Sequence, residues 1–370
     1  MRKTIFRLFA VLLLISGMFA HVQGDPAIWI SRAELDRLPM SGDAWNNLYT
    51  AALKVTRNPD LGNQDDKTDV YTMAKALIYA RGGDTSYADE VRYTLQRLVE
   101  NHPVSRSRDW GALGTLRALG SYVIAADLID LQSYDREFDQ EVFRPWLSAA
   151  RFADTERGRG SIAKLQERRP NNWGNHGSAS RVAIDLYLGD LNDLERTAKV
   201  FKGWLGDRST YAEFKYGELS WQVDEARPVG INPRGSTRNG HNIDGVLPDD
   251  ARRCGSFAWP PCKTGYQWEG LQGAVAAAEM LHRAGYPAFE WEDRAILRAI
   301  EWLYNTTFDD GKNYPAEGDD RWQIWIINKR YGAKIPVASP VSPGKMIGWT
   351  DWTHSIADVD SPPLSRPDAN

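Results

Sequence analysis

Apolar side chains recur at helical spacing along most of the chain. In the segment 86–101, for example, Val91, Leu95 and Leu98 would lie on one face of a helix. The same pattern, interrupted by Gly, Pro and Asp, predicts helices over 43–56, 67–81, 86–101, 110–130, 138–153, 176–188, 190–205, 266–284, 290–306 and 319–331. Before residue 206, no run of alternating apolar and polar residues predicts a strand.

The number and similar lengths of these helices predict an all-α fold. Consecutive helical hairpins that each bury one apolar stripe can be arranged around a ring, as an (α/α) toroid or incomplete barrel. The inner helix ends and their loops would then line a cleft. A solenoid is the competing arrangement, but it would repeat a sequence signature, and this chain shows none.

The segment 206–265 interrupts the helical pattern with many glycines and prolines. A loop of this length inside a compact domain is usually functional or disordered, and its content of Trp, Tyr, His and Arg favours a functional role. The two cysteines of the chain, Cys254 and Cys262, lie here. In an oxidising compartment we expect them to form a disulfide that closes the loop.

Both ends of the chain are expected to lie outside the fold. Residues 1–24 combine three cations with a short apolar run, which is the pattern of a secretory signal peptide. The competing interpretation, an uncleaved anchor, would require a longer apolar segment or a stop-transfer pattern. We therefore expect one toroid domain over 25–360, a loose tail over 361–370, and a periplasmic or secreted protein without membrane attachment.

Charge and aromatic content narrow the classes of partner. Without residues 1–24 the chain keeps 42 basic and 49 acidic residues, a formal charge of −7, which argues against nucleic acid or a membrane surface as partner. Its 15 Trp and 15 Tyr suit sugar rings, whose apolar faces stack on aromatic side chains. An anionic substrate would have to meet a local basic cleft.

The first candidate site precedes the helix predicted at 176–188. It contains Arg169, Asn171, Asn172, Trp173 and His176. The N-terminus of a helix favours an anion, and amides with an imidazole at that position would bind a carboxylate. The alternative is that the asparagines and glycines only cap the helix and form a turn.

The second candidate site is the polar, glycine-rich segment 234–245. His241 lies there and not on an apolar helix face, which favours a role in a site over a buried structural role. Arg238, in the same segment, is a candidate for binding a neighbouring carboxylate with both ends of its guanidinium.

The third candidate site lies where the irregular segment enters the helix predicted at 266–284. Tyr266 stands at the helix entrance, close in sequence to the cations Arg252, Arg253 and Lys263 and to Trp268. A phenol beside cations can act first as a base and then as an acid. The alternative is a tyrosine at the edge of the core that bonds to a carbonyl. Two cysteines without a nearby histidine pair make a poor metal site, so we expect no metal and no cofactor.

These motifs resemble the alginate lyase superfamily of polysaccharide lyases. The resemblance rests on Asn171, Asn172 and Trp173 before one helix, and on Tyr266-x-Trp268-Glu269-x-Leu271 opening a later apolar helix. The helical pattern agrees over nearly the whole chain after residue 24. Alginate lyases have a histidine after the asparagine pair where this chain has Trp173, so His176 or His241 would have to substitute, and the spacing from arginine to tyrosine is longer here.

The resemblance implies metal-independent β-elimination from a 4-linked uronate polymer, of polymannuronate or glucuronan type. Asn172, helped by one of the two histidines, would neutralise the sugar carboxylate. Tyr266 would remove the C5 proton and return it to O4, supported by Arg252 or Arg253. Cleavage would leave a 4,5-unsaturated uronate end.

Two other functions remain open at this point. An (α/α)-barrel glycoside hydrolase would use paired carboxylates, for which the candidates are Asp244, Asp249, Asp250 and Glu269. A non-catalytic polysaccharide-binding protein is suggested by four tryptophans near the C-terminus, Trp322, Trp325, Trp349 and Trp352. An unsaturated product distinguishes a lyase from both.

Overall fold

The computed structural model describes residues 28–355, and helices form nearly all of its regular structure. They are α1 (Arg32–Leu35), α2 (Asp43–Ala52), α3 (Thr68–Gly82), α4 (Thr85–Asn101), α5 (Ala112–Leu128), α6 (Leu131–Tyr134), α7 (Arg136–Phe138), α8 (Arg144–Ala150), α9 (Ile162–Arg168), α10 (Asn172–Leu188), α11 (Leu191–Leu205), α12 (Pro248–Ala251), α13 (Gly265–Arg283), α14 (Trp291–Asn305), α15 (Trp322–Tyr331) and α16 (Thr350–Thr353). The predicted all-α class is confirmed. The predicted signal peptide and the tail at 361–370 lie outside the described residues.

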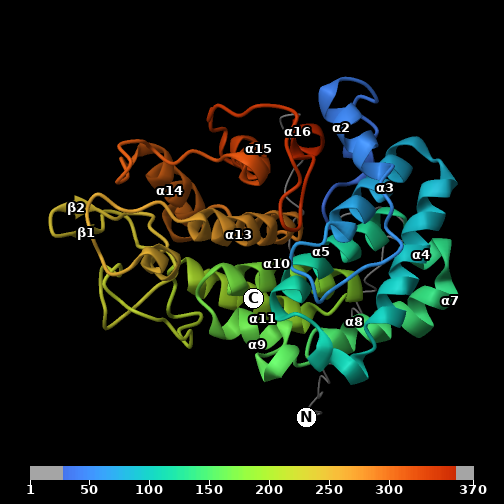
Figure 1. Cartoon of the computed structure of the whole chain (residues 1–370), viewed down its shortest axis with the longest axis horizontal. Helices are drawn as coiled ribbons and strands as arrows, with labels where there is room; N and C mark the ends of the chain where they lie inside the picture. The colour runs from blue at the N-terminus through green and yellow to red at the C-terminus, as the bar shows by residue number, and fades with distance from the viewer. Residues whose placement is uncertain (1–27, 356–370) are drawn as a thin grey trace, which may run out of the picture.

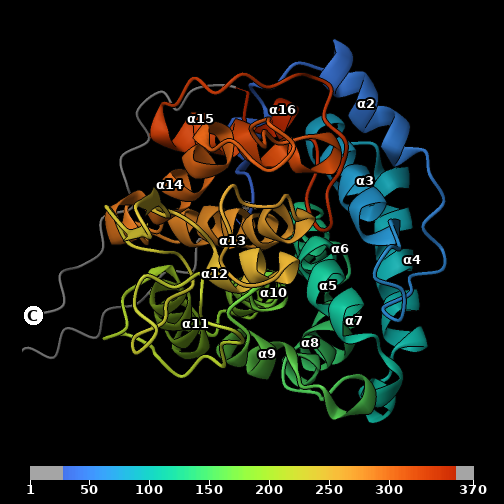
Figure 2. The ribbon, with the colours of Figure 1, turned by 60° about the vertical axis from the view of Figure 1, so that its left-hand side comes forward.

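The helices follow one another around a ring (Figures 1 and 2). Helix α3 packs on α5, α5 on α10, α10 on α13 and α13 on α15. Helices α4, α11 and α14 pair with α3, α10 and α13, and α16 contacts α2, which packs back on α3. This succession of helical hairpins is the toroid that the sequence predicts. Within it, α10 lies between α5 and α13 and packs on both.

Helix α13 is buried on almost every side because its middle is apolar or small all round. Gly273 lies where α13 crosses α10, so close to the backbone of Asn175 and His176 that a Cβ would overlap with it. On the facing helix, the Asn175 side chain donates to the carbonyl of Gly270, 3.1 Å away. The two helices therefore touch backbone to backbone, which fixes the position of every side chain near the crossing.

Replacing Gly273 by alanine is expected to lower the free energy of unfolding by about 1–3 kcal/mol. The added Cβ would meet the backbone of Asn175 and His176, which cannot move aside as a flexible side chain can. Gly265, in the first turn of the same helix, is the matched control, since nothing lies within 4 Å of a Cβ added there. Urea unfolding of both alanine variants measures the difference. Equal stability of the two would show that the crossing is looser than described.

Most helix boundaries lie within two residues of the predicted ranges. Helix α2 ends at Ala52 and not at 56, α8 begins at Arg144 and not at 138, α15 begins at Trp322 and not at 319, and α9 was not predicted. The start of α10 also differs. This helix begins at Asn172, four residues earlier than predicted, because Asn171 caps it and accepts a hydrogen bond from the Trp173 backbone N–H at 3.2 Å. Gly174, a poor helix former, is needed there because a Cβ would collide with the Arg169 carbonyl. The asparagine motif is thus the first turn of a helix, and not a loop before one.

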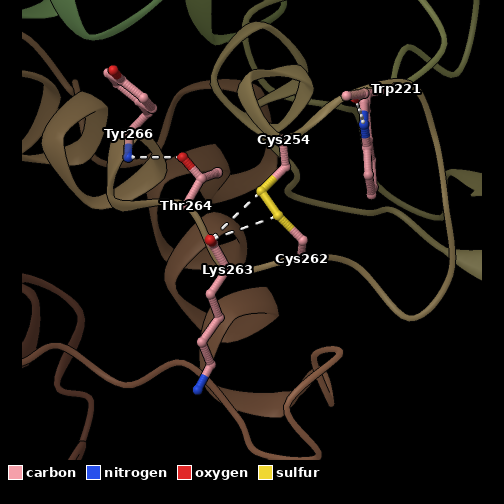
Figure 3. Close-up of a disulfide and its surroundings, with 7 residues drawn as sticks. Trp221, Cys254, Cys262, Lys263, Thr264 and Tyr266 are labelled. Atoms are coloured by element: carbon pink, nitrogen blue, oxygen red, sulfur yellow. Dashed lines mark hydrogen bonds between the residues drawn. A yellow bond between two sulfur atoms is a disulfide. The ribbon is translucent and has the colours of Figure 1, made fainter.

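The segment between α11 and α13 is irregular, as predicted, apart from a short antiparallel hairpin of β1 (Thr237–Arg238) and β2 (His241–Asn242), the single turn of α12 and the 3₁₀ turn after it (Arg252–Cys254). The expected disulfide between Cys254 and Cys262 is present, just before α13 (Figure 3). Beside it, Trp221 donates its indole N–H to the Gly255 carbonyl at 3.1 Å. Within residues 28–355, every helix is too short or too polar to cross a membrane.

Candidate active site

A cluster of charged side chains lies where the three central helices meet. Arg117 of α5 contacts the carboxylate of Glu269 on α13. His176 of α10 places Nε2 3.7 Å from the same carboxylate, and Lys345, from the loop after α15, places Nζ 3.9 Å from its other oxygen. We call these four residues the Glu269 cluster. One carboxylate therefore connects four segments that are far apart in the sequence.

Further polar groups contact Arg117 and Lys345. The Lys345 ammonium lies 3.6 Å from Asp65 and 3.8 Å from Asp319, and Gln64 accepts a hydrogen bond from Arg117 at 3.4 Å. The three carboxylates thus lie 3.6–3.9 Å from Lys345, farther than a strong charge-assisted hydrogen bond of about 2.8 Å. A lysine held this loosely can turn toward an incoming anion.

The charges of Glu269 and His176 are set by their surroundings. Burial alone would raise the pKa of Glu269, but His176, Arg117 and Lys345 outweigh it and lower the pKa to about 2. Burial lowers the pKa of His176 to about 4, and the two nearby cations act in the same direction, while Glu269 opposes them. At neutral pH the cluster therefore holds an ionised glutamate and a neutral histidine.

Several polar atoms beside the cluster are buried without a hydrogen-bond partner among the described residues. They are Oδ1 of Asn172, both ring nitrogens of His176, and Nε of Arg117. Leaving a buried polar atom unpaired costs about 1–3 kcal/mol, so such atoms are normally paired with protein groups, ordered water or a ligand. Because Asn172 and His176 are four residues apart on α10, they share one face of the helix.

The N-terminus of α10 is held in place by the two aspartates of α12. The side chain of Asn171 donates to Asp249 at 2.8 Å, and the backbone N–H of Asn172 donates to Asp250 at 3.2 Å. Burial, together with neighbouring Asp249, raises the pKa of Asp250 well above its usual range. Both aspartates, candidates for hydrolase acids from the sequence, therefore position the asparagine motif.

Arg252 and Asn171 have structural contacts that the sequence did not predict. Arg252 binds both oxygens of Asp249, with Nε 2.7 Å from Oδ1, and its guanidinium does not lie over the tyrosine. The amide of Asn171 is used at both ends, by the helix cap and by Asp249. In this structure the predicted catalytic arginine and the predicted substrate-binding asparagine thus act as positioning residues.

Tyr266 borders the same cluster from the first turn of α13. Thr264 caps this helix, accepting from the Tyr266 backbone N–H at 3.4 Å, and Figure 3 shows the phenol directed away from the disulfide. Tyr266 is 39% exposed, and the guanidinium of Arg253 lies 4.2 Å from its ring centroid. Burial lowers the pKa of Arg117, and Glu269 and Tyr266 are among the nearby groups that oppose this effect. Of the two candidate arginines, Arg253 is the one beside the phenol.

Trp173 lines a pocket of about 380 Å³ next to the cluster. Two of its lining residues, Gln64 and Asp65, contact Arg117 and Lys345, so the pocket adjoins the cluster on this side. The guanidinium of Arg159 lies 5.4 Å from the Trp173 ring, a contact absent from the sequence-based prediction. Arg169, the other candidate from this motif, is exposed.

The second predicted site belongs to a different part of the molecule. The His241 ring stacks on Trp259, with ring centroids 4.5 Å apart and planes 9° apart. Arg238 binds Glu225 at 2.6 Å and the carbonyl of Gln222. Neither side chain has a contact with the Glu269 cluster among the described residues, so His176 is the histidine that accompanies Asn172.

Two further predicted substrate-binding residues have other partners. Lys263 pairs with Asp310 at 2.7 Å and points away from Tyr266 in Figure 3. Trp268 is fully buried, and its ring contacts Tyr304 and Tyr314 edge to face, so it is a core residue. The same holds for three of the C-terminal tryptophans that suggested a binding protein, which are buried: Trp322, Trp349 and Trp352.

Sequence reasoning missed Arg117 and Lys345. Arg117 is a buried cation in a mostly apolar helix, and a charge at such a position needs a partner, which is typical of a site. That signal was available in the sequence. Lys345 lies in a loop rich in proline and glycine, where nothing in the sequence indicates its neighbours.

Stability is expected to fall as the pH drops from about 7 to about 5, because of His176. The unfolded chain takes up this proton near pH 6.5 and the folded chain only near pH 4. The stability contributed by the neutral ring is therefore complete above the unfolded pKa and is lost below it, by roughly 2 kcal/mol between pH 7 and pH 5. Urea unfolding of the wild type and of His176→Gln at both pH values isolates the effect. Between pH 7 and pH 5 the free energy of unfolding of the variant should fall by roughly 2 kcal/mol less than that of the wild type.

Among residues 28–355, no group of three or more histidine, cysteine or carboxylate side chains is arranged to hold a metal ion. Comparison of the chain with models of known protein families finds no match, and comparison with curated proteins finds none. The function is therefore inferred from the chemistry of the site itself.

Proposed function

We propose that the protein is a polysaccharide lyase that cleaves a 4-linked uronate polymer by β-elimination. The observation that carries the proposal is the set of buried polar atoms without a protein partner on Asn172 and His176, beside the Arg117 and Lys345 cations of the Glu269 cluster. Tyr266 lies three residues before Glu269 on α13. A sugar carboxylate is a ligand that such a set would satisfy. The resemblance to the alginate lyase superfamily supports the same reaction.

The first task of such an enzyme is to make the C5 hydrogen of the uronate acidic. The neutral ring of His176 donates one N–H to the sugar carboxylate, and the Asn172 amide, rotated to present its NH₂ group, donates another. Arg117 and Lys345 add positive charge close by. As negative charge builds up on the carboxylate oxygens, each preorganised donor is worth about 3–4 kcal/mol.

The second task is proton transfer. The Tyr266 phenolate takes the C5 proton, the electron pair forms the C4–C5 double bond, the C4–O4 bond breaks, and the phenol returns the proton to O4. The Arg253 guanidinium on the ring stabilises the phenolate. In mannuronate and glucuronate the C5 hydrogen and O4 lie on the same side of the ring, so one residue serves both steps, whereas guluronate requires two.

The cleft suits a polymer better than a single sugar. The Trp173 pocket adjoins the cluster at Gln64 and Asp65, and its aromatic face suits the next sugar unit, with the cation of Arg159 beside it. The predicted signal peptide supports action in the periplasm or outside the cell, where such polymers occur as substrates.

A second function, glycoside hydrolysis, is favoured by one observation. Burial raises the pKa of Asp320 to about 7, with Asp319 and Glu269 adding to the effect, while the pKa of Glu269 is lowered to about 2. Two carboxyl groups with separated pKa values are the acid and the base of many glycosidases. Against it, Glu269 is bound by Arg117, and Asp320 accepts from Gln272 at 2.8 Å.

The proposal is tested by incubating the purified protein with polymannuronate, polyguluronate, glucuronan and glycosaminoglycans and following the ultraviolet absorbance of the new double bond. We expect absorbance with polymannuronate or glucuronan and none with polyguluronate. Shortening of a polymer without absorbance would favour the hydrolase, and no change with any polymer would reject both.

A further inference from the structure

A second pocket, of about 480 Å³, lies between the hairpin and α14, which are neighbours in both views of the ribbon (Figures 1 and 2). Its volume is within the range of about 300–1,000 Å³ that is usual for small-molecule sites. Its lining includes Trp259, Trp302, Glu301 and Asn305, and it shares no lining residue with the Trp173 pocket or the Glu269 cluster.

The aromatic wall of this pocket is held rigidly. The half-buried ring of Trp259 is backed by the parallel ring of His241. Trp302 is buried, donates its indole N–H to the Asn242 carbonyl at 3.0 Å and packs edge to face on Phe308. A fixed, partly exposed tryptophan face is the usual platform for the apolar face of a sugar ring, because little side-chain entropy is lost on stacking.

The charges around the pocket disfavour an acidic sugar. The guanidinium of Arg298 is used by the carboxylate of Asp244 and by the carbonyls of Asn232, Glu292 and Asp293. No other cation is among the lining residues, whereas Glu301 is exposed and negative.

The remaining polar groups suit sugar hydroxyls. Asn242, Asn305 and Thr307 are exposed on the pocket lining and carry amide or hydroxyl groups. We propose that this pocket is a non-catalytic binding site for a neutral oligosaccharide. The inference is independent of the lyase proposal, because it concerns a different pocket and an uncharged ligand.

The test is isothermal titration of the full-length protein with cellotetraose, mannotetraose, xylotetraose and an oligoglucuronate. We expect at least one neutral tetrasaccharide to bind, and the affinity to fall about tenfold in Trp259→Ala, equivalent to about 1.4 kcal/mol. Asn305→Ala changes an exposed residue and should weaken binding without affecting the fold. Glu301→Gln should leave neutral binding intact.

Lyase activity should not change in any of the three variants. Absence of binding by all neutral probes, or neutral binding that is unaffected by both Trp259→Ala and Asn305→Ala, would overturn the inference. So would wild-type binding of the oligoglucuronate that is lost in Trp259→Ala.

Discussion

Replacement of Tyr266 by phenylalanine is expected to lower the rate of elimination by roughly 10²–10⁴-fold, the usual contribution of general acid–base catalysis. The phenol oxygen is the only group removed, and it is the proposed carrier of the C5 proton. Because the ring stays beneath Arg253, substrate binding should be nearly unchanged. Steady-state kinetics on the active polymer would therefore show a fall in kcat at similar KM.

Tyr93→Phe provides the matched control, since Tyr93 is an exposed tyrosine on another helix, α4. It should retain full activity. If Tyr266→Phe also turned over at the wild-type rate, the proton would have to be transferred by another residue, and the role given to the first turn of α13 would be wrong.

The second large effect is expected at Asn172. Its replacement by alanine should reduce kcat by roughly 10²–10³-fold, as for other donors that stabilise developing negative charge. KM should change less, because the amide contributes most when charge builds up on the sugar carboxylate. Asn172→Asp keeps the shape of the side chain but places a negative charge beside the negative sugar carboxylate, so it should lower kcat and raise KM.

Asn46, exposed on α2, gives the control alanine variant, which should behave as the wild type. Unfolding measurements on the Asn172 variants separate catalysis from stability, because the backbone N–H of Asn172 still bonds to Asp250 in both. An unchanged kcat in a folded Asn172→Ala protein would place the carboxylate elsewhere.

The helical fold could be predicted from the sequence because local pattern and tertiary packing agree. In α13 the long run of apolar and small residues is both a helix former and the buried face against α10. At α10 the local sequence pattern and the tertiary packing conflict. Gly174 and Gly177 weaken the local helical signal, but Gly174 is required by the close Arg169 carbonyl and Gly177 packs tightly on Leu116, so the true start at Asn172 was missed.

Within the candidate site, helical spacing explains which predicted residues meet. Asn172 and His176 are four apart and share a face, as Tyr266 and Glu269 do at three apart. Trp268, two residues after Tyr266, must point elsewhere, and this was predictable once 266–284 was taken as a helix. No such periodic spacing relates the side chains of the irregular segment 206–265 to one another.

There the partners depend on tertiary folding alone. Nothing in the order of residues reveals that Arg253, and not Arg252, lies on the phenol, or that His241 stacks on Trp259. The same is true of Lys345, which reaches the cluster from the loop after α15.

The most direct test of elimination at the Glu269 cluster is mass spectrometry of the products formed in ¹⁸O-labelled water. Elimination breaks the C4–O4 bond without adding water, so each new non-reducing end should be one water lighter than a hydrolytic end, and neither end should carry solvent oxygen. Saturated non-reducing ends, one water heavier, with one ¹⁸O incorporated for every bond broken, would contradict the account and identify the protein as a hydrolase.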